Sequence, residues 1–227
     1  MIKTSPKPLP SIIPHPKRER LPKGRAVTIG MGFRCSDGIV VCADTQITWQ
    51  GHKDYECKVY YLSGHDWTMA SVYAGSPHLM KSFIIPSKEI GMFKTEGKIA
   101  SAVPSFDYVG CGDSSLLRYL GPILADKQQW LSINQALRVG TSCILQAKRY
   151  VEDCGGETDA FVLGWNGSMQ TRSGMTYNWE QHFLRLERDL TSILRAIGNA
   201  TVNDEEFENR LNAFSKHVRE ERVLAEH

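Results

Sequence analysis

The sequence predicts an α+β fold in which helices cover a β-rich core. Short runs rich in β-branched residues occupy the first half of the chain, and segments with helical spacing of apolar residues dominate the second half. Strands followed by helices are typical of layered α+β folds. With 227 residues, the chain suits one compact domain, because single cores usually extend over roughly 100–200 residues and layered folds somewhat further.

The first 25 residues differ in composition from the rest of the chain. They hold six of the ten prolines and seven Lys or Arg residues against one acid, Glu19. Proline fixes φ and removes a hydrogen-bond donor, so we expect a polyproline-like or disordered basic arm. Without this arm the formal charge falls from +2 to −4, which disfavours nucleic-acid binding by the body of the protein.

Composition also restricts the compartment and the metal chemistry. No apolar run approaches the ~18 residues of a membrane span, and Lys and Pro interrupt the early apolar stretches, unlike a secretory signal. We therefore expect a cytoplasmic protein without a membrane partner. The six cysteines lack the spacing of a metal site, and we interpret them as reduced thiols that pack as small hydrophobes.

Four strands are expected near the start of the body. The first two, over 27–33 and 38–43, are joined by an Asp-Gly pair at 37–38, which is a strong hairpin signal. Two more strands are expected over 58–62 and 67–74. Their order predicts an antiparallel meander.

The elements after residue 90 are predicted to be a hairpin, one strand and four helices. The hairpin is expected over 90–109, with its turn at Thr95-Glu96-Gly97, and the strand over 159–165. Helical spacing predicts the four helices over 114–126, 132–152, 179–197 and 204–224. Ser132, followed three residues later by Gln135, is a capping-box signal at the second helix.

Three landmarks follow one another in the first part of the body. The run from Thr28 to Asp44 contains a threonine, a short strand, an Asp-Gly turn, an apolar strand and an acid. Lys58 then opens a strand, and Ala74-Gly75 ends the next one. This order resembles the N-terminus of a mature proteasome β subunit, which belongs to the N-terminal nucleophile (Ntn) hydrolase superfamily.

Two later motifs extend the resemblance over most of residues 28–165. Gly110-Cys111-Gly112 is similar to the family's Gly-Ser-Gly, and Cys154-Gly155-Gly156 to its Ser-Gly-Gly. The resemblance implies a four-layer αββα Ntn-hydrolase sandwich formed by residues 28–227. The interval from Gly75 to Gly110 is much shorter than in the family, so one helical layer is expected to be shortened there, and the long C-terminal helices are expected to compensate.

The resemblance also implies catalytic roles for four residues. A terminal threonine can use its own α-amino group, with an unperturbed pKa of roughly 7.7–8.0, as the base for its hydroxyl. Thr28 would then be nucleophile and base. Lys58 would supply fixed positive charge, Asp44 would orient Lys58, and the Gly75 amide would stabilise the oxyanion.

Six further positions receive weaker assignments from the same resemblance. Supporting roles are assigned to Cys111, Asp153 and Cys154. Walls of the substrate pocket are assigned to Ile47, Thr48 and Tyr73.

Taken together, these assignments imply a threonine-type endopeptidase. It would be a subunit of a ring of like or related subunits, with peptides or unfolded proteins as substrates, possible assistance from an ATPase partner, and no cofactor or metal. Residues 1–27 would be a propeptide whose removal exposes Thr28.

Departures from the family pattern keep other functions open. Val27 stands where the family usually has glycine before the threonine, and Val151 stands where an acid is expected. A non-catalytic structural or gating subunit with an uncleaved arm is therefore an alternative. An amidase or peptide ligase using the same nucleophile is another. A cysteine enzyme with Cys111 as nucleophile and His65 or His78 as base is a fourth reading.

Overall fold

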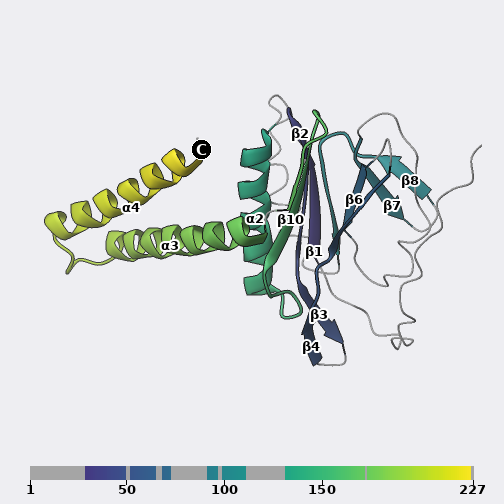
Figure 1. Ribbon diagram of the computed structural model, residues 1–227. Coiled ribbons are helices and arrows are strands. Elements are labelled where there is room, and N and C mark those ends of the chain that lie inside the picture. Colours follow the sequence, from purple (N-terminus) through teal and green to yellow (C-terminus); the bar gives the residue numbers. More distant parts are fainter. Residues whose placement is uncertain are drawn as a thin grey trace, which may run out of the picture.

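A five-stranded antiparallel sheet forms the centre of the molecule (Figure 1). The computed structural model describes residues 29–49, 52–64, 68–72, 91–96, 99–110, 131–171 and 173–225. In spatial order the sheet consists of β11 (Met169–Thr171), β10 (Thr158–Gly164), β2 (Gly38–Asp44), β1 (Ile29–Arg34) and β9 (Phe106–Gly110). The predicted β1–β2 hairpin around Asp37-Gly38 is thereby confirmed.

Three two-stranded hairpins accompany this sheet. They are β3 (Gln46–Trp49) with β4 (His52–Tyr55), β5 (Val59–Ser63) with β6 (Thr68–Val72), and β7 (Phe93–Glu96) with β8 (Ile99–Ala102). The expected four-strand meander is wrong, because β2 pairs with β10 and not with β5. The hairpin predicted over 90–109 is confirmed only around its turn, as β7–β8. Its expected last residues instead form β9 (Phe106–Gly110), which pairs with β1 in the central sheet.

Three helices are described: α2 (Ile133–Tyr150), α3 (Ser173–Ile197) and α4 (Asp204–Ala225). The predicted capping box is present, since the Ser132 side chain accepts from the Gln135 amide and the Gln135 side chain accepts from the Ser132 amide. The helix expected over 114–126 lies outside the described residues. None of the described helices combines the length and the apolar character that crossing a bilayer requires.

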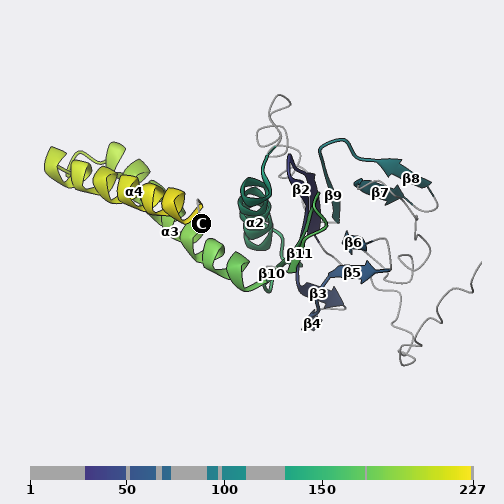
Figure 2. The same cartoon turned by 45° about the horizontal axis from the view of Figure 1, so that its top comes forward.

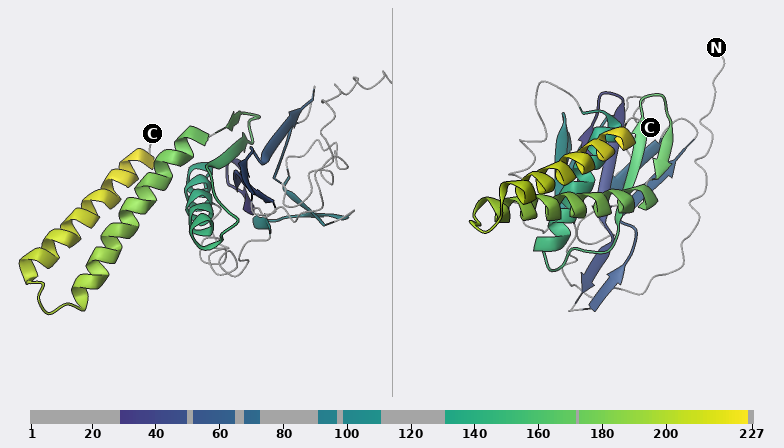
Figure 3. Two further views of the ribbon diagram at one scale, coloured as in Figure 1. Left: turned by 90° about the horizontal axis from the view of Figure 1, so that it is seen from below. Right: turned by 90° about the vertical axis from the view of Figure 1, so that its left-hand side faces the viewer.

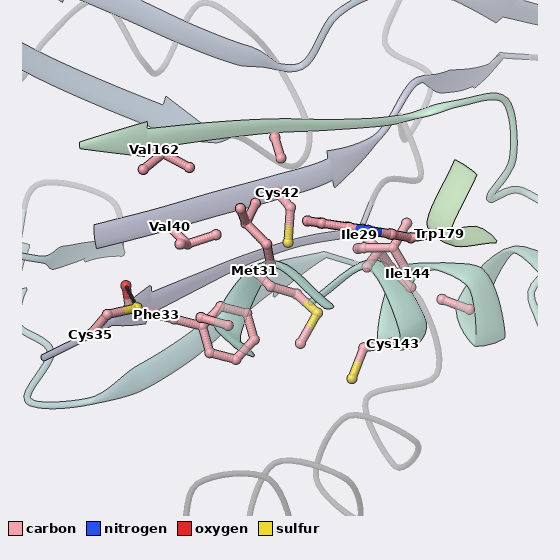
Figure 4. Packing of buried hydrophobic residues seen from close by; sticks show 14 of the residues in the cluster. Ile29, Met31, Phe33, Cys35, Val40, Cys42, Cys143, Ile144, Val162 and Trp179 are labelled. Atoms are coloured by element: carbon pink, nitrogen blue, oxygen red, sulfur yellow. Dashed lines mark hydrogen bonds between the residues drawn. The ribbon is translucent and has the colours of Figure 1, made fainter. Parts of the chain in front are cut away.

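The main core lies between the sheet and α2. Alternate residues of β1 point to this side, including Ile29, Met31 and Phe33, and they pack against buried residues of α2 such as Ile144 (Figure 4). Trp179 of α3 closes the same cluster. The period-two pattern of the strands therefore decides which side chains meet the helix.

The β5–β6 hairpin covers the opposite face of the sheet. Val59 packs there with Phe161, whose ring stacks on Tyr61 with 5.4 Å between centroids. Gly30 permits the close approach, because a Cβ at this position would lie 2.3 Å from a Val72 methyl. The described chain thus forms helix, sheet and hairpin layers in that order (Figures 1 and 2), which confirms a mixed helix-and-sheet architecture.

The C-terminal helices do not cover the second face of the sheet as expected. α3 begins against α2 and β10, and α3 and α4 then run together away from the sheet, on the side opposite to β5–β8 (Figures 1 and 3). The reason is the direction of α3, whose first half carries the buried residues Thr176, Trp179 and Glu180. Its second half packs mainly on α4.

Candidate active site

An ion pair between Lys58 and Asp44 is buried at the end of β2. The Lys58 ammonium lies 2.8 Å from Asp44 Oδ1, and the side chains are 1% and 0% exposed. Lys58 also donates to the backbone carbonyl of Gln46. Because an ammonium has three donors, two of them are accounted for among the described residues.

Two backbone amides complete the surroundings of the Asp44 carboxylate. Ile29 N–H donates to Oδ1 at 3.0 Å, and Gly155 N–H donates to Oδ2 at 3.2 Å. A buried carboxylate is tolerated when it is paired and hydrogen-bonded in this way. The pair is therefore tied directly to the first residue of β1 and to the turn after α2.

The turn after α2 is shaped to reach Asp44. α2 ends at Tyr150, and the carbonyl of its C-cap residue Val151 accepts from the Cys154 amide at 3.0 Å. Gly156 then adopts a φ of +72°, a left-handed conformation that glycine accepts without the Cβ penalty. A Cβ at Gly156 would lie 2.2 Å from Thr45 Oγ1. The Gly-Gly motif thus allows the turn to sit against the chain just after Asp44.

Burial and pairing act on Lys58 in opposite directions. Burial lowers the pKa of the Lys58 ammonium below its usual value. The charge of Asp44 and its hydrogen bond oppose this shift, with a smaller electrostatic contribution from Cys154. Because desolvation is the larger effect, the charged lysine depends on its carboxylate partner.

The remaining site candidates that the structure describes are Ile47, Thr48, Asp153 and Cys154. Thr48 donates through Oγ1 to the carbonyl of Asp153 at 3.3 Å, and it accepts from the Gln46 side-chain amide at 3.0 Å. Ile47 is half-buried on β3. Cys154 is 4% exposed and belongs to the main core cluster.

Several sequence predictions concern residues that the structure does not describe. Thr28, Tyr73, Gly75 and Cys111 all lie outside the described residues, as do His65 and His78 of the cysteine alternative. The structure therefore brings together Asp44, Lys58, Thr48, Asp153 and Cys154, and the roles assigned to all of these residues remain predictions.

Sequence reasoning missed the contribution of the backbone. The carbonyl of Gln46 and the amides of Ile29 and Gly155 have no side-chain signature, although Gly155 stood within a recognised motif. The β3–β4 hairpin beside the site was also missed, because all four residues of His52–Tyr55 are exposed and the segment lacks alternating apolar residues.

The site offers a fixed charge in a dry environment. A lysine clamped by a carboxylate can stabilise a developing anion and lower the pKa of a neighbouring amine. Within the described ranges, no three His, Cys, Asp or Glu side chains gather as metal ligands would. The described residues of the site thus supply a buried positive charge held by a carboxylate.

Comparison with known proteins identifies the fold. No family model matches the chain, and no curated protein sequence does so. Among solved structures, Anbu from Yersinia bercovieri, titled an ancestral β-subunit, matches with a TM-score of 0.56 at 10% identity, covering 78% of this chain and all of that chain (100%). An Anbu mutant from Hyphomicrobium sp. strain MC1 matches with a TM-score of 0.54 at 12% identity, covering 73% and 97%.

At such low identity the likeness concerns the fold. The chain has the Ntn-like fold of Anbu, and the sequence resemblance to proteasome β subunits is consistent with a distant relation. The site residues are not tested by this comparison.

Proposed function

We propose that the chain is a threonine-type endopeptidase subunit of a proteasome-like assembly, with Thr28 as its N-terminal nucleophile. The observation that carries the proposal is the hydrogen bond from Ile29 N–H to Asp44 Oδ1, the same oxygen that pairs with Lys58. Thr28 is bonded directly to Ile29. A charge pair anchored at that backbone nitrogen is suited to serve a nucleophile one residue earlier.

In the proposed mechanism the α-amino group of Thr28 takes the proton from its own hydroxyl. The attacking oxygen then adds to the carbonyl of a peptide bond, and the Gly75 amide faces the resulting oxyanion. Lys58 stabilises the alkoxide with its positive charge, and Asp44 holds the lysine in place. Cys111, Asp153 and Cys154 support this arrangement, while Ile47, Thr48 and Tyr73 contact the substrate.

The proposal also covers the removal of a propeptide and the fold of the mature domain. Residues 1–27 act as a propeptide that is removed between Val27 and Thr28, and residues 28–227 form the Ntn-hydrolase domain. The fold proposed for this domain is the four-layer αββα sandwich, with one helical layer shortened between Gly75 and Gly110. The likeness to a protein titled a β-subunit supports association with like subunits, and a cytoplasmic location with an ATPase partner is part of the same proposal.

A specific residue favours the alternative of a non-catalytic structural or gating subunit. Val27 occupies the position before the threonine, where the resemblance leads us to expect glycine. If the bond after Val27 stays intact, Thr28 has no free α-amino group and the mechanism has no base. The basic arm would then remain on the assembled protein.

Intact mass and N-terminal sequencing of the purified protein test the proposal first. A chain that begins at Thr28 supports the peptidase function, and its peptide-cleaving activity should disappear in Thr28→Ala. Thr201→Ala is the matched control, because Thr201 is exposed in the α3–α4 connection. A chain that retains residues 1–27 after assembly would exclude the terminal-threonine mechanism and support the gating subunit.

A further inference from the structure

An exposed apolar stripe runs along the second half of α3. Leu190, Leu194 and Ile197 are 46%, 60% and 67% exposed. Spacings of four and three residues place the three side chains on one side of a helix. No segment of the chain that the structure describes covers them.

The stripe lies on the same side of α3 as the residues that attach this helix to α2 and the sheet. Trp179 and Phe183 pack on the core that α2 and the sheet form. Leu190 and Leu194 follow them by 11 residues each, which is about three helical turns. The side of α3 that carries Trp179 and Phe183 packs on the body, and the second half of the helix extends beyond the body (Figure 3).

A groove lies where α3 leaves the body. It has a volume of about 760 Å³, and its walls come from the end of α2, the middle of α3 and Arg210 of α4. Its lining includes Leu190 and Leu194 together with Arg188 and Arg195. The lining of the groove thus combines apolar and basic side chains.

The charges of the groove are only partly neutralised within the chain. Arg149 pairs with Glu187, and Arg210 pairs with Glu206. Arg188 and Arg195 are exposed and form no ion pair with any residue that the structure describes. A partner for this groove should therefore present carboxylates beside an apolar surface.

The tip of the same hairpin presents that chemistry. α4 begins with Asp204 and Glu205, which are exposed and lie at the far end of the hairpin from the body (Figure 1). Ile197, 67% exposed, lies at the tip as well. The tip offers carboxylates and an apolar side chain, and the groove offers apolar side chains with Arg188 and Arg195, so two copies of the chain have complementary surfaces.

We propose that the groove receives the acidic hairpin tip of a second copy of this chain. Because the groove and the tip are different surfaces, every copy can donate one and accept another, and the contact repeats head to tail into a ring or a helix. The inference rests on the subunit part of the proposed function and does not depend on Thr28. It assigns to α3 and α4 the role of an assembly arm.

Sedimentation of the full chain provides the first test. The wild type should sediment as an assembly at micromolar concentration, and Leu194→Glu should sediment as a monomer with an unchanged circular dichroism spectrum. Val218→Glu is the matched control, because Val218 is 43% exposed on α4 and does not line the groove. A monomeric wild type, or an assembled Leu194→Glu variant, would overturn the proposal.

Complementary charge reversal identifies the contacting surfaces. Arg188→Glu with Arg195→Glu, and separately Asp204→Lys with Glu205→Lys, should each abolish assembly. An equimolar mixture should restore it, since each altered groove then meets an altered tip, and each original groove meets an original tip. A mixture that stays monomeric would refute the assigned contact.

A correctly processed, peptidase-active monomer would contradict only this inference, whereas an assembled chain with an intact arm would contradict only the catalytic proposal.

Discussion

Asp44 and Lys58 form a buried pair whose existence is not explained by stability. Removing two charges from water costs several kcal/mol per ion, and their mutual attraction repays this only with good geometry and further hydrogen bonds. Asp44 meets that condition through the amides of Ile29 and Gly155. An apolar pair of similar volume is often as stable as a buried ion pair or more so, so the fold alone does not require these two charges.

The pair should be strongly coupled in folding. Lys58→Met leaves the buried Asp44 carboxylate without its counter-ion, and we expect a loss of about 3–5 kcal/mol in the free energy of unfolding. Combining it with Asp44→Asn should cost less than the sum of the two single changes. Urea unfolding measures all three, with the exposed Lys53→Met as control. A loss below about 1 kcal/mol for Lys58→Met would contradict the burial of the pair.

The lowered pKa of Lys58 gives a signed dependence of stability on pH. In the unfolded chain this lysine titrates near 10.5, whereas burial lowers its pKa in the folded protein. Between the two values the unfolded state binds more protons, so the free energy of unfolding contributed by Lys58 increases as pH rises. The cost of burying the charged form is fully present below the folded pKa and is relieved as pH approaches 10.5.

We therefore expect the stability difference between wild type and Lys58→Met to grow with alkaline pH. Urea unfolding of both proteins from about pH 8 to about pH 10.5 measures it, and titrations common to both cancel in the difference. A difference that shrinks over this range would mean that the attraction of Asp44 outweighs desolvation and raises the lysine pKa.

At the scale of elements, the sequence predicted a helix or strand correctly where the residues of the element and those of its turn or cap both indicated it. β1, β2 and the cap of α2 follow from an Asp-Gly turn, β-branched runs and the Ser132–Gln135 pair. Strand partners did not follow, because the choice of β10 over β5 for β2 depends on contacts more than 100 residues apart in the chain. The start of α3 at Ser173 was also missed, since no apolar periodicity precedes Trp179.

In the candidate site, too, the residues could be predicted from the sequence, whereas their long-range partners could not. Asp44 and Lys58 were predicted from their order in the sequence, and the structure brings them together. Their other partners are backbone groups, whose positions depend on the tertiary fold and not on residue type. The position of Gly155 against Asp44 required the α2–β10 turn to be known in three dimensions.

That turn is the element whose geometry we expect to be most sensitive to a methyl group. Gly156→Ala places a Cβ at a φ of +72° and 2.2 Å from Thr45 Oγ1. Gly167→Ala is a matched control, because its φ is +81° but nothing lies within 4 Å of the added Cβ. Both variants should lose about 1–2 kcal/mol in the free energy of unfolding, because alanine is strained in the left-handed conformation. Gly156→Ala should lose roughly a further 1–3 kcal/mol because the added Cβ overpacks the site.

Thermal or urea unfolding of the two alanine variants measures this difference. We expect Gly156→Ala also to disturb the hydrogen bond from Gly155 to Asp44, whereas Gly167→Ala leaves the site intact. Equal losses in the two variants would show that the turn relaxes without affecting Thr45.

At the scale of the whole molecule, a second buried charge group joins α3 to the body. Lys148 of α2 lies 2.6 Å from Glu180 of α3 and donates to Thr158 of β10 at 2.8 Å. Thr176 of α3 donates to the carbonyl of Thr158 at 2.5 Å. Thr158 is also the register partner of Asp44 in the sheet, so the helical arm and the candidate site are attached to neighbouring points of the same two strands.

This arrangement predicts that α3 is held by its first half. Glu180→Ala leaves Lys148 largely buried without its counter-ion and should cost about 3 kcal/mol or more in the free energy of unfolding. Glu187→Ala, two turns further along α3, removes a partner of Arg149 whose side chain is 44% exposed, and should cost no more than about 1 kcal/mol. Both variants remove one carboxylate from α3, the first from a buried ion pair in its first half and the second from an exposed ion pair further along the helix.

Hydrogen exchange then distinguishes anchoring from general destabilisation. In Glu180→Ala the amides over 174–197 should exchange faster than in the wild type by a larger factor than those of α2, because the helix detaches before the core opens. In Glu187→Ala the exchange of the first half of α3 should stay unchanged. Equal acceleration throughout the chain in Glu180→Ala would show instead that the Lys148–Glu180 pair supports the core as a whole, and that the arm has no separate attachment.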